Sequence, residues 1–155
     1  MTISLVPASD VSTVDDLQNL PADIRCEIHN GRLVIMSPVR VWHQNVARAI
    51  ANALERSGRH VSTDVTIRRT VSDTRMPDVA AFVRPPDLRA AVHDPDTIDL
   101  VVDVWSPSSD AKDHHEMQWY ADLGIAGYWL VEPVGDGSTL EATISRFALA
   151  TTARR

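Results

Sequence analysis

Two apolar segments, each with an acidic residue at or inside it, constrain the fold of this sequence more than any other feature. The first, residues 78–83, starts at Asp78 directly after Met76-Pro77, and the second, residues 98–105, contains Asp103. Nearly continuous apolar runs of this length are typical of central strands that are covered on both faces of a sheet. We therefore expect two adjacent central strands with helices packed on either side.

The remaining segments predict the helices and outer strands of such a fold. Ser12 and Thr13 are favourable N-cap residues and predict a short helix that ends before Pro21. The dipeptide Asn30-Gly31 is the strongest hairpin signal in the chain. Further expected elements are a strand over 33–36, an amphipathic helix over 42–56, a half-buried strand over 61–71, a loop over 85–97 with one helical turn at 87–92, a second main helix over 109–123, and strands over 126–131 and 139–147.

These elements predict an α+β (α/β) sandwich, in which a mixed central sheet is flanked by helices. The length of 155 residues fits a single domain, and the apolar content of 44% is ordinary for a globular protein. We expect the folded domain over 15–149, an N-terminal segment over 1–14 and a C-terminal tail over 150–155.

Composition also limits the cellular compartments and the binding partners that fit this chain. Cys26 is the single cysteine, so an intrachain disulfide is excluded and a reducing, cytoplasmic setting fits. The first ten residues lack the pattern of a signal peptide, and no uncharged apolar run approaches membrane-spanning length. The net charge of −6 argues against a protein that coats nucleic acid nonspecifically, but it allows a local basic strip.

The two acids indicate metal chemistry. A carboxylate inside an apolar strand, such as Asp103, is unfavourable unless it is paired, hydrogen-bonded or bound to a metal. Two carboxylates that meet at strand ends make an oxygen-ligand site for Mg²⁺, which can activate a bound water and stabilise charge on phosphorus. For Asp78 alone, a role in capping the strand is the simpler interpretation. The pair leaves the metal interpretation and the structural one equally open.

The position two residues after Asp103 bears on this interpretation. Residues 103 and 105 point to the same face of a strand, so a lysine at 105 would place its ammonium beside the Asp103 carboxylate. Trp105 stands there and fits the core or the wall of a site. Lys112 is the only lysine in the chain.

Five ordered motifs of the chain resemble a known family. They are 27–38 (EIHNGRLVIMSP), 75–79 (RMPDV), 102–108 (VDVWSPS), 120–125 (YADLGI) and 128–133 (YWLVEP), with His43 between the first two. In this order they resemble the Uma-type family of putative restriction endonucleases, a branch of the PD-(D/E)XK nuclease superfamily. The resemblance runs from about Asp15 to Phe147.

The resemblance implies a restriction-endonuclease-like core and hydrolysis of DNA phosphodiester bonds with Mg²⁺ or Mn²⁺. By position, Glu27 corresponds to an early glutamate of the family and Asp78 to the acid of its Pro-Asp motif. Asp103 stands where the family usually has glutamate. The resemblance therefore implies Glu27, Asp78 and Asp103 as catalytic metal ligands.

The family lysine is the main departure. It normally lies on the helix after the second acid, at the position of Glu116 here if counted back from Tyr120, or of Met117 if counted forward from Asp113. Lys112 lies one helical turn earlier on the same face, so we expect it either to assist catalysis or to form a solvent-exposed pair with Glu116.

Several other residues are secondary candidates. His43 matches a histidine that the family tends to carry, and a capping or packing role is equally open. Of the adjacent His114 and His115, at most one can point inward. The arginines that could contact phosphate, if they are not simply solvated, are Arg68, Arg69, Arg75, Arg84 and Arg89.

Three functions are compatible with these features. The first is a Mg²⁺-dependent DNA endonuclease, for which a C2 homodimer would suit the cutting of both strands. The second is a nuclease-derived protein that has lost catalysis and serves as a nucleic-acid-binding or dimeric interaction module. The third is a metal-dependent hydrolase that acts on another phosphoester.

Overall fold

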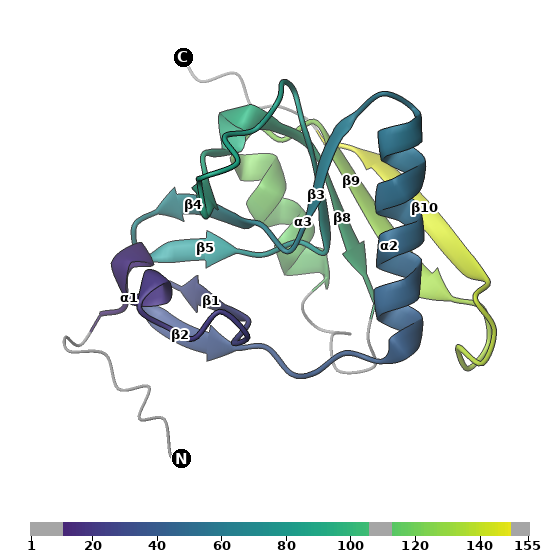
Figure 1. The fold of residues 1–155 in the computed structure, drawn as a ribbon, viewed down its shortest axis with the longest axis horizontal. Coiled ribbons are helices and arrows are strands. Elements are labelled where there is room, and N and C mark those ends of the chain that lie inside the picture. Colours follow the sequence, from purple (N-terminus) through teal and green to yellow (C-terminus); the bar gives the residue numbers. More distant parts are fainter. Residues whose placement is uncertain (1–10, 106–112, 150–155) are drawn as a thin grey trace.

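The computed structural model describes residues 11–105 and 113–149 (Figure 1). The described residues form α-helices, a short 3₁₀ helix η1 and strands, most of which follow one another in runs. Their bounds are α1 (Val14–Gln18), β1 (Cys26–His29), β2 (Arg32–Ile35), α2 (Val41–Arg56), β3 (His60–Thr63), β4 (Thr66–Thr70), β5 (Asp73–Arg75), β6 (Val79–Phe82), β7 (Val92–His93), η1 (Pro95–Thr97), β8 (Ile98–Val104), α3 (Asp113–Asp122), β9 (Gly127–Pro133) and β10 (Ala142–Ala148).

The main sheet is mixed and has the strand order β10-β9-β8-β6-β3. Strands β8 and β9 are parallel, and the other neighbours in the sheet are antiparallel. Both strands predicted to be central, β6 and β8, are internal, and every residue of β6 is buried. Because Val79 pairs with Val102, the antiparallel register brings Asp78, just before β6, next to Asp103.

A helix covers each face of this sheet (Figure 1). Apolar residues of α2, among them Val46 and Ile50, pack on Val79, Val102 and Val131. The other face carries a second cluster whose largest members are aromatic: Trp119 and Tyr120 of α3, Tyr128 of β9 and Phe82 of β6. The predicted class, a mixed sheet flanked by helices in an α+β fold, is therefore confirmed.

The Asn30-Gly31 hairpin is also confirmed, and it brings Glu27 to the main sheet. Both turn residues have positive φ (49° and 84°), as a two-residue hairpin turn requires. Strand β1 docks on β5 through two hydrogen bonds, from the Ile28 amide to Thr74 Oγ1 (3.0 Å) and from the Arg75 guanidinium to the Ile28 carbonyl (3.2 Å). Since β5 leads directly into Met76-Pro77-Asp78, the hairpin lies beside the Pro-Asp segment.

Three details of the predicted elements were wrong. The single strand expected over 61–71 is split between β3 in the main sheet and β4 in a small sheet of order β5-β4-β7, because Asp64 adopts a left-handed conformation (φ 54°) between them. In place of the helical turn expected at 87–92, the structure has a hydrogen-bonded turn from the Ala90 amide to the Asp87 carbonyl (3.1 Å), and Val92 begins β7. A 3₁₀ helix, η1, forms after Asp94, where Pro95 can begin a helix. Strand β5 was not predicted, since the three residues of Asp73–Arg75 are too short and polar to show a pattern.

The second main helix is confirmed from Asp113 onward, and residues 106–112 lie outside the described part of the chain. Gly124 ends it with φ 79°, a conformation that favours glycine. Among the described helices, none is long and apolar enough to cross a membrane.

Candidate active site

Asp78 is held at the end of β6 by three groups. It is buried, and its Oδ2 accepts a hydrogen bond of 2.6 Å from the backbone amide of Val104 in β8. Its Oδ1 lies 3.2 Å from Nε2 of His43 on α2 and 3.6 Å from the Arg25 guanidinium. The Asp78 carboxylate therefore links β8 to the start of β6 and is also paired with His43 and Arg25.

His43 is buried on the first turn of α2, so the sequence candidate does reach Asp78. Within the described residues, its Nδ1 has no hydrogen-bond partner. A pocket of about 250 Å³ opens beside the pair. It is lined by His43, Gln44, Ala47, Arg48, Thr63, Asp64 and Asp78. Solvent or a substrate group can therefore approach Asp78 from this side.

Asp103 points to the α3 face of the sheet, as the alternation along β8 requires. The hydroxyl of Tyr128 donates a hydrogen bond of 2.9 Å to its Oδ2. Burial raises the pKa of Asp103 well above its ordinary value, and the negative charges of Asp78, Glu116 and Glu27 raise it further, while the Tyr128 hydrogen bond acts in the opposite direction. Four acids from four segments therefore converge on one region.

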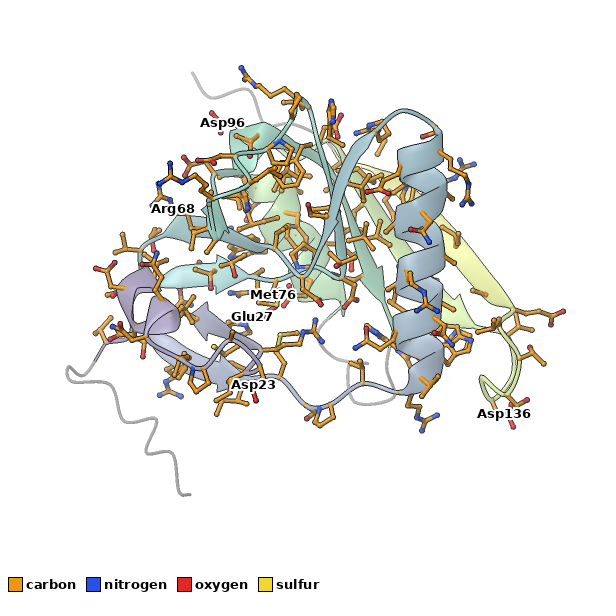
Figure 2. All side chains as sticks on the ribbon, in the orientation of Figure 1. Asp23, Glu27, Arg68, Met76, Asp96 and Asp136 are labelled. Atoms are coloured by element: carbon orange, nitrogen blue, oxygen red, sulfur yellow. The ribbon has the colours of Figure 1, made fainter. Side chains whose placement is uncertain are left out.

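Glu27 is buried in β1 and contacts the Pro-Asp segment itself (Figure 2). Its Oε1 accepts a hydrogen bond of 2.9 Å from the amide of Met76. Its Oε2 lies 2.6 Å from Nε2 of His29, two residues further along the same strand. The early glutamate is therefore tied to the backbone that positions Asp78.

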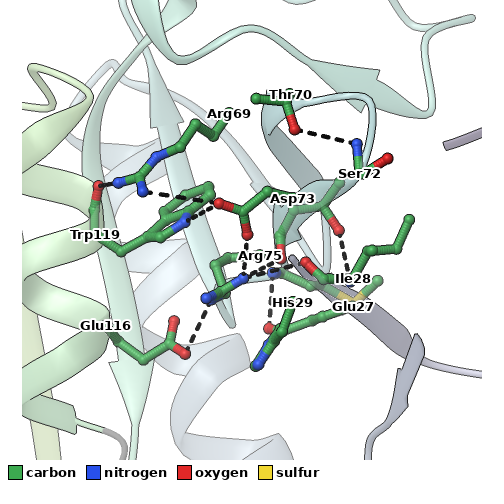
Figure 3. Close-up of polar contacts among 12 residues, drawn as sticks. Glu27, Ile28, His29, Arg69, Thr70, Ser72, Asp73, Arg75, Glu116 and Trp119 are labelled. Atoms are coloured by element: carbon green, nitrogen blue, oxygen red, sulfur yellow. Dashed lines mark hydrogen bonds and ion pairs between the residues drawn. The ribbon is translucent and has the colours of Figure 1, made fainter. Parts of the chain in front are cut away.

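Glu116, at the position expected for the family lysine, is ion-paired with an arginine (Figure 3). The Nε of Arg75 lies 3.3 Å from its Oε1. The Arg75 guanidinium is fixed in turn by Asp73 (2.9 Å), the Thr74 carbonyl (2.8 Å) and the Trp119 ring below it. Helix α3 is thus linked to β5 by a charge pair in which the helix carries the acid and the strand carries the arginine.

Ligand atoms of Glu27, His29 and Glu116 all lie within 4.8 Å of one another. Asp78 and Asp103 are not members of this group, so the three carboxylates predicted as metal ligands do not form one set at that spacing. His29 was not a candidate. Its signal was present, because residues two apart on a strand share a face, but a single histidine next to a turn gave no reason to select it.

The remaining candidates fall into two classes. Lys112 lies outside the described residues, as do the side chains of His114 and His115. Three of the five arginines have partners within the chain: Arg68 pairs with Asp94 (2.8 Å), Arg69 donates to the Trp119 carbonyl (3.3 Å), and Arg75 is engaged as described. The other two, Arg84 and Arg89, are exposed.

Trp105 forms part of a wall rather than the core. It is half-buried, and with Trp42 and His43 it lines a second pocket of about 300 Å³. The aromatic residues Trp119, Tyr120 and Tyr128 are buried in the core cluster on the α3 face of the sheet.

The family model of Uma2, described as "Putative restriction endonuclease", matches residues 13–140. The chain belongs to the Uma2 family. It is also similar to the crystal structure of a "putative nuclease belonging to DUF820" from Anabaena variabilis, with a TM-score of 0.61 and 16% identity over 85% of this chain and 83% of that one. At this identity the likeness shows the shared fold. Comparison with curated proteins found no match.

Uma2 membership and the fold support a nuclease function and a nucleic-acid substrate. The donor set is compatible with a divalent cation, since carboxylate oxygens and an imidazole nitrogen are ordinary ligands of such ions. The Uma2 region, 13–140, contains every acid described above.

Proposed function

We propose that this chain is a divalent-metal-dependent DNA endonuclease, in which Asp78, Asp103 and Glu27 hold Mg²⁺ or Mn²⁺. One observation carries the proposal: in a nuclease-family fold, the pairing of Val79 with Val102 brings Asp78 next to Asp103, and Glu27 accepts a hydrogen bond from the Met76 amide two residues before Asp78. Such a concentration of like charge in a buried region is unfavourable, and a divalent cation is the natural counter-charge.

The chain's own groups have distinct parts in this proposal. Tyr128 orients Asp103 by its hydrogen bond to Oδ2, and the Val104 amide orients Asp78. His43 contacts Asp78 Oδ1 and borders the open pocket, so it is placed to exchange a proton with water or a substrate oxygen there. A bound cation would lower the pKa of a coordinated water and stabilise the charge on the scissile phosphate.

We further propose Lys112 as the source of the positive charge that the family lysine supplies. On a continuous helix it would lie one turn before Glu116. Its test is Lys112→Met, which should lower the cleavage rate by about 100-fold if the ammonium stabilises the transition state. Lys112→Arg as a control keeps the charge, and equal activity of wild type and Lys112→Met would remove Lys112 from the site.

The main experiment is cleavage of supercoiled plasmid by purified protein with Mg²⁺, with Mn²⁺ or with EDTA. Nicked or linear product should form only with metal, and Asp103→Asn should abolish it. Asp96→Asn is a suitable control, because Asp96 lies on η1 at a distance from the acids (Figure 2). An intact plasmid at both metals, with folded protein, would refute the proposal. Parallel assays with RNA and a small phosphodiester would test the choice of DNA over other phosphoesters.

The second candidate is a nuclease fold without catalysis that binds nucleic acid or a second copy of the chain. Its support is Glu116, an acid at the position of the family lysine, held by Arg75. Glu116→Lys separates the two functions: cleavage in the variant alone supports loss of catalysis in the natural chain, and cleavage by the wild type excludes it. Light scattering of the same preparations would test the proposed homodimer.

A further inference from the structure

We propose that Glu27, His29 and Glu116 form a binding site for a transition-metal ion of the Zn²⁺, Co²⁺ or Mn²⁺ class. This site shares Glu27 with the proposed nuclease site but does not include Asp78 or Asp103, and it does not depend on nuclease activity. Its donors are one imidazole nitrogen and two carboxylates, whose ligand atoms lie within 4.8 Å of one another.

The backbone brings these donors together from two elements. Glu27 and His29 are two residues apart on β1, so their side chains lie on the same face of the strand. Glu116 of α3 lies on the other side of the Arg75 side chain (Figure 3). Ligand atoms around one ion stand at about 2.0–2.2 Å from it, so opposite ligands are separated by roughly 4 Å. Two of the ligand atoms, His29 Nε2 and Glu27 Oε2, lie 2.6 Å apart and share a hydrogen bond. An ion would take the place of the shared proton, and side-chain rotations would widen this spacing to that of ligands around one ion.

Outer contacts hold two of the three ligands in place. The Met76 amide binds Glu27 Oε1, and Arg75 binds Glu116 Oε1. Arg75 is itself fixed by Asp73 and by the backbone carbonyls of Thr74 and Ile28. Hydrogen bonds of this kind around a metal site orient the ligating carboxylates and reduce the cost of ordering them.

Exposure and charge also fit a bound ion. The side chains of Glu27, His29 and Glu116 are 10%, 27% and 15% exposed, so they are shielded but an ion can reach them. Glu27, Glu116 and Asp73 carry three negative charges around the single positive charge of Arg75, so a dication would balance the remaining two. A lysine at position 116 would add a positive charge and repel a cation. The glutamate at this position instead supplies a ligand for one.

The donor types define the metal. Mg²⁺ prefers oxygen ligands and retains its waters, whereas an imidazole favours Mn²⁺, Co²⁺, Ni²⁺ and Zn²⁺. We therefore expect Co²⁺ and Zn²⁺ to bind this site in preference to Mg²⁺.

The test is titration of tag-free protein with Co²⁺, followed by visible absorption, and with Zn²⁺ and Mg²⁺, followed by calorimetry. His29→Ala and Glu116→Gln should each weaken Co²⁺ and Zn²⁺ binding by about tenfold or more, since loss of a ligand exceeds loss of an outer contact. Zn²⁺ should raise the Tm of the wild type and not of His29→Ala. His29→Gln serves as a second variant if His29→Ala does not fold. His60→Ala, a change at an exposed histidine on β3, should leave binding unchanged.

Equal Zn²⁺ affinity in the wild type, His29→Ala and His29→Gln would overturn the site. So would a loss confined to the double variant His114→Ala/His115→Ala, because it would assign the ion to those histidines. The nuclease proposal is tested independently. His29-dependent Co²⁺ binding by a protein that leaves plasmid intact supports this site and refutes only the nuclease, whereas metal-dependent cleavage without His29-dependent binding does the reverse.

Discussion

Two acidic regions of the molecule differ in how their charge is balanced. The strand-end acids, Asp78 and Asp103, belong to the main sheet, and their oxygens are bound by donors of the fold itself, including the Val104 amide and the Tyr128 hydroxyl. The hairpin–helix group, Glu27, His29 and Glu116, joins two elements outside that sheet and combines acids with an imidazole.

This difference indicates that substitutions in the two regions should affect the stability of the fold to different extents. Asp78 contributes to the joining of two strands, so its substitution changes the structure as well as any chemistry. The hairpin–helix group is held through Arg75, and its members can be changed with less effect on the sheet. Stability and metal binding should therefore respond separately, and the following substitutions test that separation in order of their expected effect on the free energy of unfolding.

The largest effect is expected for Asp78→Ala. It removes the acceptor of the Val104 amide and leaves His43 and Arg25 without their shared carboxylate. Breaking a buried pair of this kind costs about 3–5 kcal/mol. Urea denaturation in EDTA should show this loss, and a separate assay with Mg²⁺ should show the loss of plasmid cleavage.

The matched control is Asp64→Ala. Asp64 also pairs with Arg25, at 2.7 Å, but its side chain is 43% exposed. A pair of that exposure contributes about 1 kcal/mol or less. If Asp78→Ala were no less stable than Asp64→Ala, the structural role assigned to Asp78 would be wrong.

Arg75→Ala should be the second largest, at about 2–3 kcal/mol, because it leaves charged partners in a buried region without their donor. Its effect is smaller than that of Asp78→Ala because buried Asp73 keeps its hydrogen bond from Trp119 Nε1 (3.1 Å). Thermal and urea unfolding measure this loss. Arg68→Ala provides the comparison, since its pair with Asp94 is exposed, and an equal loss in both variants would contradict the buried role of Arg75.

Asp103→Asn should change stability in the opposite direction. Its pKa is raised in the folded state, so the ionised form is less favourable there than in the unfolded chain. The stability associated with the protonated form is lost as pH rises through the folded pKa. In EDTA, the variant should therefore exceed the wild type in stability at pH 8, and the difference should shrink at acidic pH. Cleavage should fall by at least about 100-fold, as expected for loss of a metal ligand.

Unfolding curves at several pH values test this directly. The Tyr128 hydroxyl can still donate to the amide oxygen of asparagine, so the packing should be preserved. If the wild type were more stable than Asp103→Asn at pH 8, the ionised Asp103 carboxylate would be favourable in the folded state and the prediction would be wrong.

The sequence predicted the strand-end acids better than the hairpin–helix group, for a physical reason. Asp78 and Asp103 stand at and within apolar runs, so their burial and their neighbouring strands can be inferred from pattern alone. The family resemblance, confirmed by the Uma2 match, added Glu27. By contrast, the proximity of His29 to Glu116 depends on the docking of a hairpin on β5 and on the three-residue strand β5 itself, neither of which has a periodic signal.

Glu27→Gln should have the smallest effect on stability. It is the most direct test of whether the two acidic regions share a ligand, because Glu27 belongs to both proposed metal sites. The amide oxygen can still accept the Met76 hydrogen bond, so the free energy of unfolding in EDTA should change by less than about 1 kcal/mol. The loss of charge should nevertheless weaken both Co²⁺ binding and Mg²⁺-dependent cleavage. His29→Ala should weaken Co²⁺ binding far more than it lowers Mg²⁺-dependent cleavage. Asp103→Asn should lower cleavage far more than it weakens Co²⁺ binding. If Glu27→Gln altered only one of the two measurements, the glutamate would belong to that site alone and the two regions would share no ligand.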